Sequence, residues 1–284
     1  MFINEFRAPQ WLEMRFARSA LLRSPGLGDA EKQLLRRVSL RLAPDDTMYI
    51  GGQSRQYLAV GFSAMRCISR IVRHTRTNVG SVLDLPCGHG RVLRFLRAEF
   101  RKAEITGCDV DPNAVRFCER TFGSAGVLST SELSKLILSE QFDLIWCGSL
   151  VTHLDQQQTK NLLYCFWRHL APGGLCLFST HGESPREWLE ADAKSYGLSP
   201  GQRDKVLAGF AGCGYGYADY DSQIGYGISL VSFDRMTTIA SEIGDWSLVA
   251  FLERGWDDHH DVYGFFKNQS GRTPPKPIMA RSPH

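Results

Sequence analysis

Short apolar runs alternate with amphipathic segments between Ser81 and Gly182, and this alternation restricts the fold more than any other feature of the chain. The runs that read as strands are SVLDL, EITGCDV, GVLST, FDLIWCGSL and GLCLFSTHG. Asp111 and Asp155 precede two of the intervening helical segments and can cap them. Apolar strands that alternate with helices predict a parallel sheet covered on both faces. We therefore expect an α/β fold with a doubly wound, Rossmann-like sheet and right-handed crossovers.

The flanking segments predict additions to this sheet. Helical patterns cover 9–23, 30–41, 54–74 and 184–212, whereas the glycine- and tyrosine-rich segment 213–228 is typical of a loop. The runs WSLVAFLERGW and DVYGFFK lie so close together that they predict a C-terminal antiparallel hairpin, which completes a seven-stranded sheet. The first helix is expected to share one apolar face among Trp11, Leu12, Phe16 and Leu22.

The composition predicts a globular protein with a sizeable core, since 43% of the 284 residues are hydrophobic and 22% are charged. A net charge of +3 is too small to indicate a nucleic-acid partner by itself. The eight cysteines form no C-x-x-C pair, which argues against a zinc knuckle and favours reduced thiols. The N-terminal segment does not resemble a signal peptide, and no apolar run approaches the roughly 20 residues that span a bilayer. We expect a cytoplasmic protein.

The turn DLPCGHG follows the first strand, at the sheet edge where α/β proteins bind ligands. Gly88 and Gly90 allow the backbone to approach a ligand closely. A dinucleotide fingerprint would need glycine at the position of Leu93, and Asp84 would place a negative charge beside the pyrophosphate. A cationic amino group with a ribose fits better, because Asp84 can attract the cation and Asp109 can accept from ribose hydroxyls. A nicotinamide-dependent oxidoreductase remains the weaker alternative.

The segments VLDLPCGHG, ITGCDVDP, FDLIWCGSLVTHL and LAPGGLCLFSTHG resemble, in order and spacing, the motifs of class I S-adenosylmethionine-dependent methyltransferases. The resemblance covers about residues 80–182, and the terminal hairpin extends it to about 268. SLVTHL, LAPGG and STHG are similar to methyltransferases associated with glycan and lipopolysaccharide synthesis. The resemblance implies an enzyme with S-adenosyl-L-methionine as its cofactor.

The same resemblance implies which residues hold the cofactor. Those expected at the methionine part are Asp84, Pro86, Cys87, Gly88 and Gly90. Those expected along the ribose, adenine and sulfonium are Asp109, Val110, Leu128, Ser129, Cys147 and Gly148, with Tyr57 reaching in from the N-terminal helices. Two departures stand out, since Pro86 replaces a glycine of the motif and GVLSTSE lacks the acidic residue often found there. They keep open a non-catalytic, methyltransferase-like binding protein as an alternative.

Polar side chains after the later strands are candidates for chemistry. His153 and His181 could act as general bases on a substrate hydroxyl, because an imidazole titrates near neutrality, or could simply support their loops. Tyr226, Trp256 and His260 are expected to line the acceptor pocket. A metal site formed by His259, His260, Asp261 and His181 is the weaker alternative, because polar residues are expected in a hairpin turn anyway. We therefore predict no metal.

The segment CGSL after the fourth strand limits the methyl acceptor. It has neither the N/D-P-P-aromatic motif of base amino-methyltransferases nor the Pro-Cys nucleophile of cytosine C5 enzymes. We expect O-methylation of a sugar, glycan or related small metabolite and no nucleic-acid partner. The basic N-terminal helices suggest a lid or homodimer contact, with weak membrane-surface binding as the alternative.

Five segments follow from these patterns. They are an N-terminal helical segment (1–78), an S-adenosylmethionine-binding core (79–182), a helical cap insertion for the acceptor (183–228), the C-terminal part of the core sheet (229–268) and a tail expected to be disordered (269–284).

Overall fold

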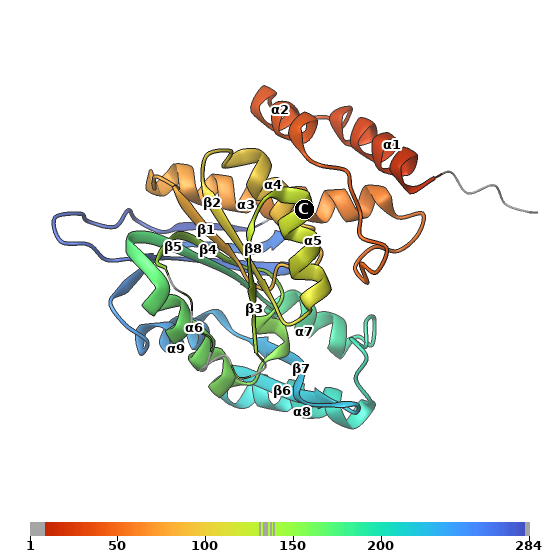
Figure 1. The fold of residues 1–284 in the computed structure, drawn as a ribbon. Helices are drawn as coiled ribbons and strands as arrows, with labels where there is room; N and C mark the ends of the chain where they lie inside the picture. The colour runs from red at the N-terminus through yellow and green to blue at the C-terminus, as the bar shows by residue number, and fades with distance from the viewer. Residues whose placement is uncertain (1–8, 131, 133–135, 137, 139, 282–284) are drawn as a thin grey trace, which may run out of the picture.

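The computed structural model describes residues 9–281 except 131, 133–135, 137 and 139. Within these residues, eight strands form one sheet in the order β10-β8-β9-β5-β4-β1-β2-β3 (Figure 1). Their bounds are β1 Ser81–Asp84, β2 Glu104–Asp109, β3 Ala125–Leu128, β4 Phe142–Cys147, β5 Leu170–Thr180, β8 Trp246–Trp256, β9 His260–Lys267 and β10 Ile278–Arg281. Strand β9 runs antiparallel to β5 and β8, and the other neighbours are parallel. The predicted doubly wound sheet and terminal hairpin are confirmed.

Helices cover both faces of the sheet, as the apolar strands predicted (Figure 1). One apolar core packs the sheet against α3 (Ser54–Thr75), α4 (Leu93–Glu99) and α5 (Pro112–Phe122). The other core packs it against α6 (Gln156–His169) and α9 (Phe233–Ser241). The N-terminal helices α1 (Gln10–Leu22) and α2 (Asp29–Arg37) form an outer layer on α3 and α4.

Side-chain caps stabilise the N-termini of two helices that follow strands, α5 and α6. Asp111 accepts a hydrogen bond from the backbone N–H of Asn113 at 2.8 Å, with Pro112 at the first position of α5. Asp155 and Gln158 form a reciprocal capping box at the start of α6. Both caps were predicted, and both lie beyond the carboxyl end of a strand, where the site is expected.

The segment 183–231 forms a cap with its own small apolar core. It contains α7 (Glu183–Glu190), α8 (Pro200–Cys213) and a separate hairpin of β6 (Tyr215–Tyr220) and β7 (Gln223–Val231). The prediction of a loop at 213–228 was therefore wrong. Ile228 and Leu230 face the cap core while Val231 faces the second sheet core, so the hairpin alternates with the strand period of two. The frequent glycines hid this alternation.

The apolar face predicted for the first helix was only partly right, since Leu22 packs against the first sheet core but two of the other three residues are exposed. Trp11 and Phe16 are 59% and 63% exposed, whereas Met14, Ala17 and Leu21 are buried. The buried residues lie three and four positions apart, so they form the narrow stripe that packs on α3.

The predicted disordered tail contains a strand. β10 pairs in parallel with β8, and Ile278 lies opposite Ala250. This pairing gives eight strands where seven were expected. Among the described residues, no helix is long and apolar enough to cross a membrane.

Candidate functional site

The turn after β1 places a buried carboxyl group beside an open stretch of backbone. Asp84 is 1% exposed, and its Oδ2 has no hydrogen-bond partner among the described residues. Burial and the nearby Asp109 carboxylate raise the pKa of Asp84 well above its usual range. Gly88 adopts a φ of +48°, and a Cβ built there would meet no heavy atom within 4 Å. A cationic group seated on this turn would give the Asp84 oxygen its missing partner.

The end of β2 is tied to the same turn. Asp109 accepts a hydrogen bond from the backbone N–H of Gly88 at 2.7 Å, and its other oxygen accepts from that of Asp111 at 3.0 Å. Each oxygen keeps a second lone pair, so the carboxylate can still accept from ligand hydroxyls. Asp109 lies opposite Leu128 in the sheet. Val110 and Leu128 are 62% and 58% exposed, so two apolar side chains flank this carboxylate.

The backbone around these carboxylates is held in place by neighbouring strands. The backbone N–H of Ser129 donates to the Asp109 carbonyl at 2.8 Å, and that of Cys87 donates to the Cys108 carbonyl at 3.0 Å. The peptide bond between Leu85 and Pro86 is cis. The carboxyl ends of β1, β2 and β3 therefore lie at the same edge of the sheet, as the sequence predicted.

The end of β4 forms a tightly packed wall of the site. Cys147 is fully buried, and burial raises the pKa of its thiol, so it stays protonated at neutral pH. A Cβ at Gly148 would lie 2.9 Å from the ring of Trp256. That ring is buried, and its Nε1–H donates to the Val60 carbonyl at 2.9 Å. Trp256 therefore belongs to the wall, with its polar atom directed away toward α3.

His153 lies in a short 3-10 helix, η2 (Val151–His153), under the cap hairpin. Its Nδ1 lies 2.7 Å from the carbonyl oxygen of Gly227. Because a carbonyl only accepts, Nδ1 carries the proton, and Nε2 of the neutral ring is an acceptor. Burial lowers the pKa of His153, which keeps the ring neutral at pH 7. Tyr226 stacks on this ring with centroids 4.6 Å apart.

His181 and His260 meet beside this site. His181 follows the end of β5, and its ring centroid lies 4.8 Å from that of His260 at the start of β9. Burial lowers the pKa of both rings, and the repulsion between them lowers that of His181 further. Both rings also interact electrostatically with His153, so the three predicted histidines share one edge of the sheet. Asp261 instead accepts from the backbone N–H of Arg254, and burial raises its pKa to about 7.

A buried arginine joins the N-terminal segment to the glycine turn. Arg94 is almost completely buried and donates to the carbonyls of Ser39, Arg41 and Gly90 at 3.1, 3.0 and 2.9 Å. It also donates to the hydroxyl of Tyr57, which itself donates to Asp46 at 2.6 Å. These partners favour a structural role for Tyr57 over the predicted cofactor contact. Sequence reasoning missed Arg94, because an arginine on an amphipathic helix reads as exposed.

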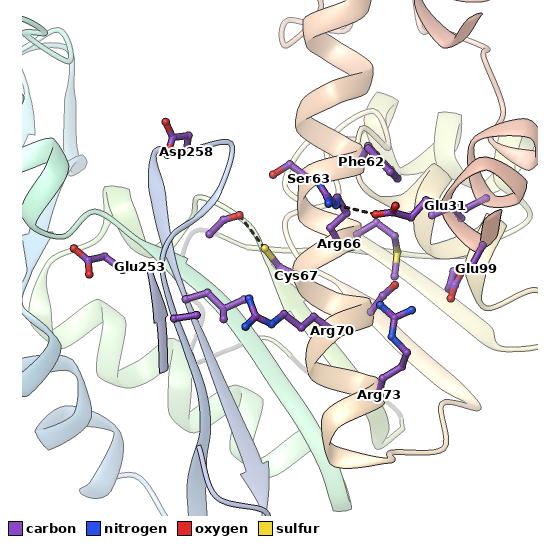
Figure 2. A pocket seen from close by; sticks show the side chains of 17 residues that line it. Glu31, Phe62, Ser63, Arg66, Cys67, Arg70, Arg73, Glu99, Glu253 and Asp258 are labelled. Carbon is purple, nitrogen blue, oxygen red and sulfur yellow. Dashed lines mark hydrogen bonds and ion pairs between the residues drawn. The ribbon is translucent and has the colours of Figure 1, made fainter. Parts of the chain in front are cut away.

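A surface groove lies elsewhere on the molecule (Figure 2). It has a volume of about 450 Å³ between α2, α3 and β8, and none of the predicted site residues lines it. Arg66, Arg70 and Arg73 follow one another along α3, and Arg66 pairs with Glu31 at 2.9 Å. The polar groups at the carboxyl ends of the strands, rather than this groove, therefore define the candidate site.

Comparison with known proteins shows that the central part of the chain is similar to methyltransferase domains. A family model described as "Methyltransferase domain" matches residues 83–176. The chain is 29% identical over 122 residues to a malonyl-[acyl-carrier protein] O-methyltransferase of Bacillus cereus, covering 42% of this chain and 44% of the relative. It is 32% identical over 128 residues to ribosomal RNA small subunit methyltransferase C of Citrobacter koseri, covering 43% and 35%. The matches span less than half the length of these curated relatives.

Solved structures agree on the fold. An S-adenosylmethionine-dependent methyltransferase from Clostridium acetobutylicum superposes with a TM-score of 0.51 at 16% identity, covering 72% of this chain and 91% of that one. An amino pentose methyltransferase from Micromonospora echinaspora, solved with S-adenosylmethionine bound, gives 0.52 at 13% identity, covering 78% and 98%. The predicted class I methyltransferase fold is therefore confirmed, and the prediction of S-adenosylmethionine as the cofactor agrees with the matched domain.

Proposed function

We propose that this protein transfers a methyl group from S-adenosylmethionine to an oxygen of a sugar, glycan or related small metabolite. One observation carries the proposal: Asp84 is a buried carboxyl group, beside the open turn at Gly88, with an oxygen that has no hydrogen-bond partner among the residues that the structure describes. Burying such a group without a partner is costly. The α-ammonium of S-adenosylmethionine would supply both the hydrogen bond and the opposite charge.

From Asp84, the rest of the cofactor would extend along the carboxyl ends of β2, β3 and β4. The ribose hydroxyls would bind Asp109, and the adenine would lie between the exposed side chains of Val110 and Leu128. Ser129 would hold the backbone beside the adenine. The sulfonium would lie against the end of β4. A pyrophosphate on the turn would meet the Asp84 carboxyl group, and Leu93 replaces the third glycine of the dinucleotide fingerprint, so both argue against a nicotinamide enzyme.

The methionine part would rest on the turn itself. Pro86 keeps its carbonyl as an acceptor for the ammonium. The backbone of Cys87 is held by the hydrogen bond from its N–H to the Cys108 carbonyl in β2. Gly88 and Gly90 leave room for the cofactor and for the turn. Cys147 and Gly148 would close the site beneath the methyl group.

His153 is the residue we assign to proton transfer. Its unprotonated Nε2 can accept the proton of the acceptor hydroxyl. The oxygen then forms a bond to the methyl carbon, and the electron pair of the broken carbon–sulfur bond returns to sulfur. The products are the methyl ether and S-adenosylhomocysteine, and the proton stays on His153 until solvent removes it. His181 is the alternative base on the same edge.

The cap supports an acceptor of modest size. The predicted insertion 183–228, whose last strand continues to Val231, would form the acceptor-binding part, and 79–182 the cofactor-binding core. Tyr226 stacks on His153, and Tyr220 lies 6.0 Å from Tyr226 between ring centroids, so aromatic faces suited to a sugar ring lie beside the proposed base. His260 and Trp256 would form the opposite wall. A sugar acceptor is also in keeping with the amino pentose methyltransferase among the structures that share this fold.

Transfer of radiolabelled methyl groups from S-adenosylmethionine to a panel of mono- and oligosaccharides tests this proposal. The wild-type protein should label at least one hydroxyl-bearing acceptor, and His153→Ala should slow turnover while retaining cofactor affinity. His169→Ala, whose ring binds the Cys165 carbonyl at the end of α6, is the matched control and should be fully active. Tight cofactor binding without transfer to any saccharide, carboxylate or RNA acceptor would favour the non-catalytic alternative.

A further inference from the structure

We propose that His181, His259 and His260 form a binding site for a divalent transition-metal ion, with Zn²⁺ as the preferred ion. One ring nitrogen from each histidine lies within 4.8 Å of the other two. His181 directly follows β5, whereas His259 ends the turn after β8 and His260 begins β9. The fold rather than sequence proximity therefore assembles the third ligand.

One ring nitrogen of His181, the buried histidine of the group, has no hydrogen-bond partner in the described part of the chain. Nδ1 of His181 is inaccessible to solvent and accepts or donates no hydrogen bond among the described residues. A buried polar atom without a partner costs free energy, and a metal ion would remove that cost. His181 is surrounded by aromatic rings, with the centroids of His259 and His260 at 5.0 and 4.8 Å.

The other two rings are oriented by hydrogen bonds through a single nitrogen. Nδ1 of His260 lies 3.3 Å from the Ser179 hydroxyl, and Nε2 of His259 lies 2.7 Å from the Tyr196 hydroxyl. Each ring therefore keeps one nitrogen for a ligand. Metal-binding histidines usually carry such a partner on the second nitrogen, where it fixes the tautomer and the ring orientation.

Protonation does not compete with the ion at neutral pH. Burial lowers the pKa of His259 to about 4, and it lowers those of His181 and His260 as well. Lys194 interacts electrostatically with all three rings and reinforces these shifts. Metal ligation requires the neutral imidazole, so the direction of these shifts agrees with the site that the geometry indicates.

The spacing and the ligand type favour zinc. Two nitrogens bound to tetrahedral zinc lie about 3.4 Å apart, since each bond is about 2.1 Å long. The three ligand atoms now lie within 4.8 Å of one another, so the rings would move closer together when the ion binds. Imidazole nitrogens suit Zn²⁺, Cu²⁺ and Ni²⁺ rather than Mg²⁺ or Ca²⁺. Three protein ligands leave one position open, as in catalytic zinc sites.

The role of the ion rests on the proposed function, although its binding does not. His153 interacts with His181 and His260, so the open position would lie near the proposed base. The cations Arg91 and Lys194 also reach His260 and favour an anionic fourth ligand. An ion there would lower the pKa of a coordinated acceptor hydroxyl and help it lose its proton to His153.

Equilibrium dialysis of the untagged full chain against Zn²⁺, followed by elemental analysis, tests the site. Wild type and His169→Ala should retain an equimolar amount of Zn²⁺, whereas His259→Ala and His260→Ala should each reduce retention at least tenfold. Replacing Zn²⁺ by Co²⁺ should give the intense visible absorption of a tetrahedral complex in wild type and His169→Ala but in neither of the other two variants. Thermal melting and S-adenosylhomocysteine titration of each variant show that it is folded.

Two results would overturn the inference. One is wild-type protein that binds no Zn²⁺ or Co²⁺, and the other is metal retention that survives both histidine substitutions in folded variants. Failure of the metal site and failure of the proposed function are separable. If the protein binds S-adenosylhomocysteine but no metal, the metal site is wrong and the proposed methyl transfer is unaffected. If it binds metal but no S-adenosylhomocysteine, the metal site is supported and the proposed function is wrong.

Discussion

The backbone N–H of Gly88 donates a hydrogen bond to a carboxylate oxygen of Asp109 at 2.7 Å, joining the turn after β1 to the end of β2. This contact spans the edge of the sheet where the cofactor is expected to bind. It presents the turn, the open space at Gly88 and the carboxylate as one surface. The proposed cofactor site depends on these two residues acting together.

Two glycines of this turn should respond differently to the same substitution. Gly88→Ala places a methyl group in open space, so it should cost only the roughly 1–2 kcal/mol of the left-handed conformation while obstructing the cofactor. Gly90→Ala would place its Cβ in steric conflict with the ring of Phe122 and should add about 1–3 kcal/mol of overpacking. Thermal melting and S-adenosylhomocysteine titration distinguish the two. Equal melting temperatures would contradict this assignment.

Asp84→Asn should stabilise the ligand-free protein and impair cofactor binding. The folded pKa of Asp84 is raised, so its favourable contribution is present below about pH 3.9 and is lost as pH rises through the folded pKa. The asparagine amide cannot ionise, so the variant should avoid this loss of folding stability at pH 7. Each kcal/mol recovered should raise the melting temperature by about 2–4 °C.

Asp143→Asn is the contrasting control for that change. One oxygen of Asp143 accepts from the backbone N–H groups of Gly80 and Ser81 at 2.8 and 3.0 Å. The amide there should lower the melting temperature and leave cofactor affinity unchanged. A fall in stability for both variants would mean that Asp84 has a partner in the ligand-free protein.

Asp109→Ala should weaken S-adenosylhomocysteine binding by about 1–3 kcal/mol, because the ribose hydroxyls lose their acceptor and the Gly88 N–H loses its own. Titration calorimetry measures the loss. Asp192→Ala, which removes an exposed carboxylate paired with Arg203 on the cap, is the control and should bind normally. Unchanged affinity in Asp109→Ala would exclude Asp109 from the site.

The turnover rate should fall with acid as His153 becomes protonated. Burial lowers its pKa, so the rate at saturating substrate should be level above about pH 6.5 and decline below the folded pKa. The hydrogen bond to the Gly227 carbonyl opposes this effect, since it favours the protonated ring, but burial is the larger cause. The profile of His153→Ala should lack this acidic limb. An unchanged limb would assign it to another group.

Much of the fold could be predicted because its signals are local. The caps at Asp111 and Asp155 and the apolar strands each follow from a few neighbouring residues. The β6–β7 hairpin was missed because glycines interrupt its alternating pattern. The strand β10 was missed because pairing with β8, rather than propensity, orders the tail.

The candidate site was predictable to the extent that strand ends share an edge. Asp84, Gly88 and Asp109 follow from that rule, and the structure adds the contacts between them. The positions of the strand ends could not reveal that Arg94 is buried and donates a hydrogen bond to the Gly90 carbonyl of the turn. They also could not reveal that Arg94 donates to the hydroxyl of Tyr57. These contacts join segments distant in sequence, and only packing brings them together.

Calorimetric titration of the wild-type protein with S-adenosylhomocysteine, with NAD in parallel, tests the central claim most directly. We predict micromolar binding of S-adenosylhomocysteine, none of NAD, and loss of the first in Asp84→Asn. Absence of S-adenosylhomocysteine binding in folded wild-type protein would contradict the assignment of this edge of the sheet as a methyl-donor site.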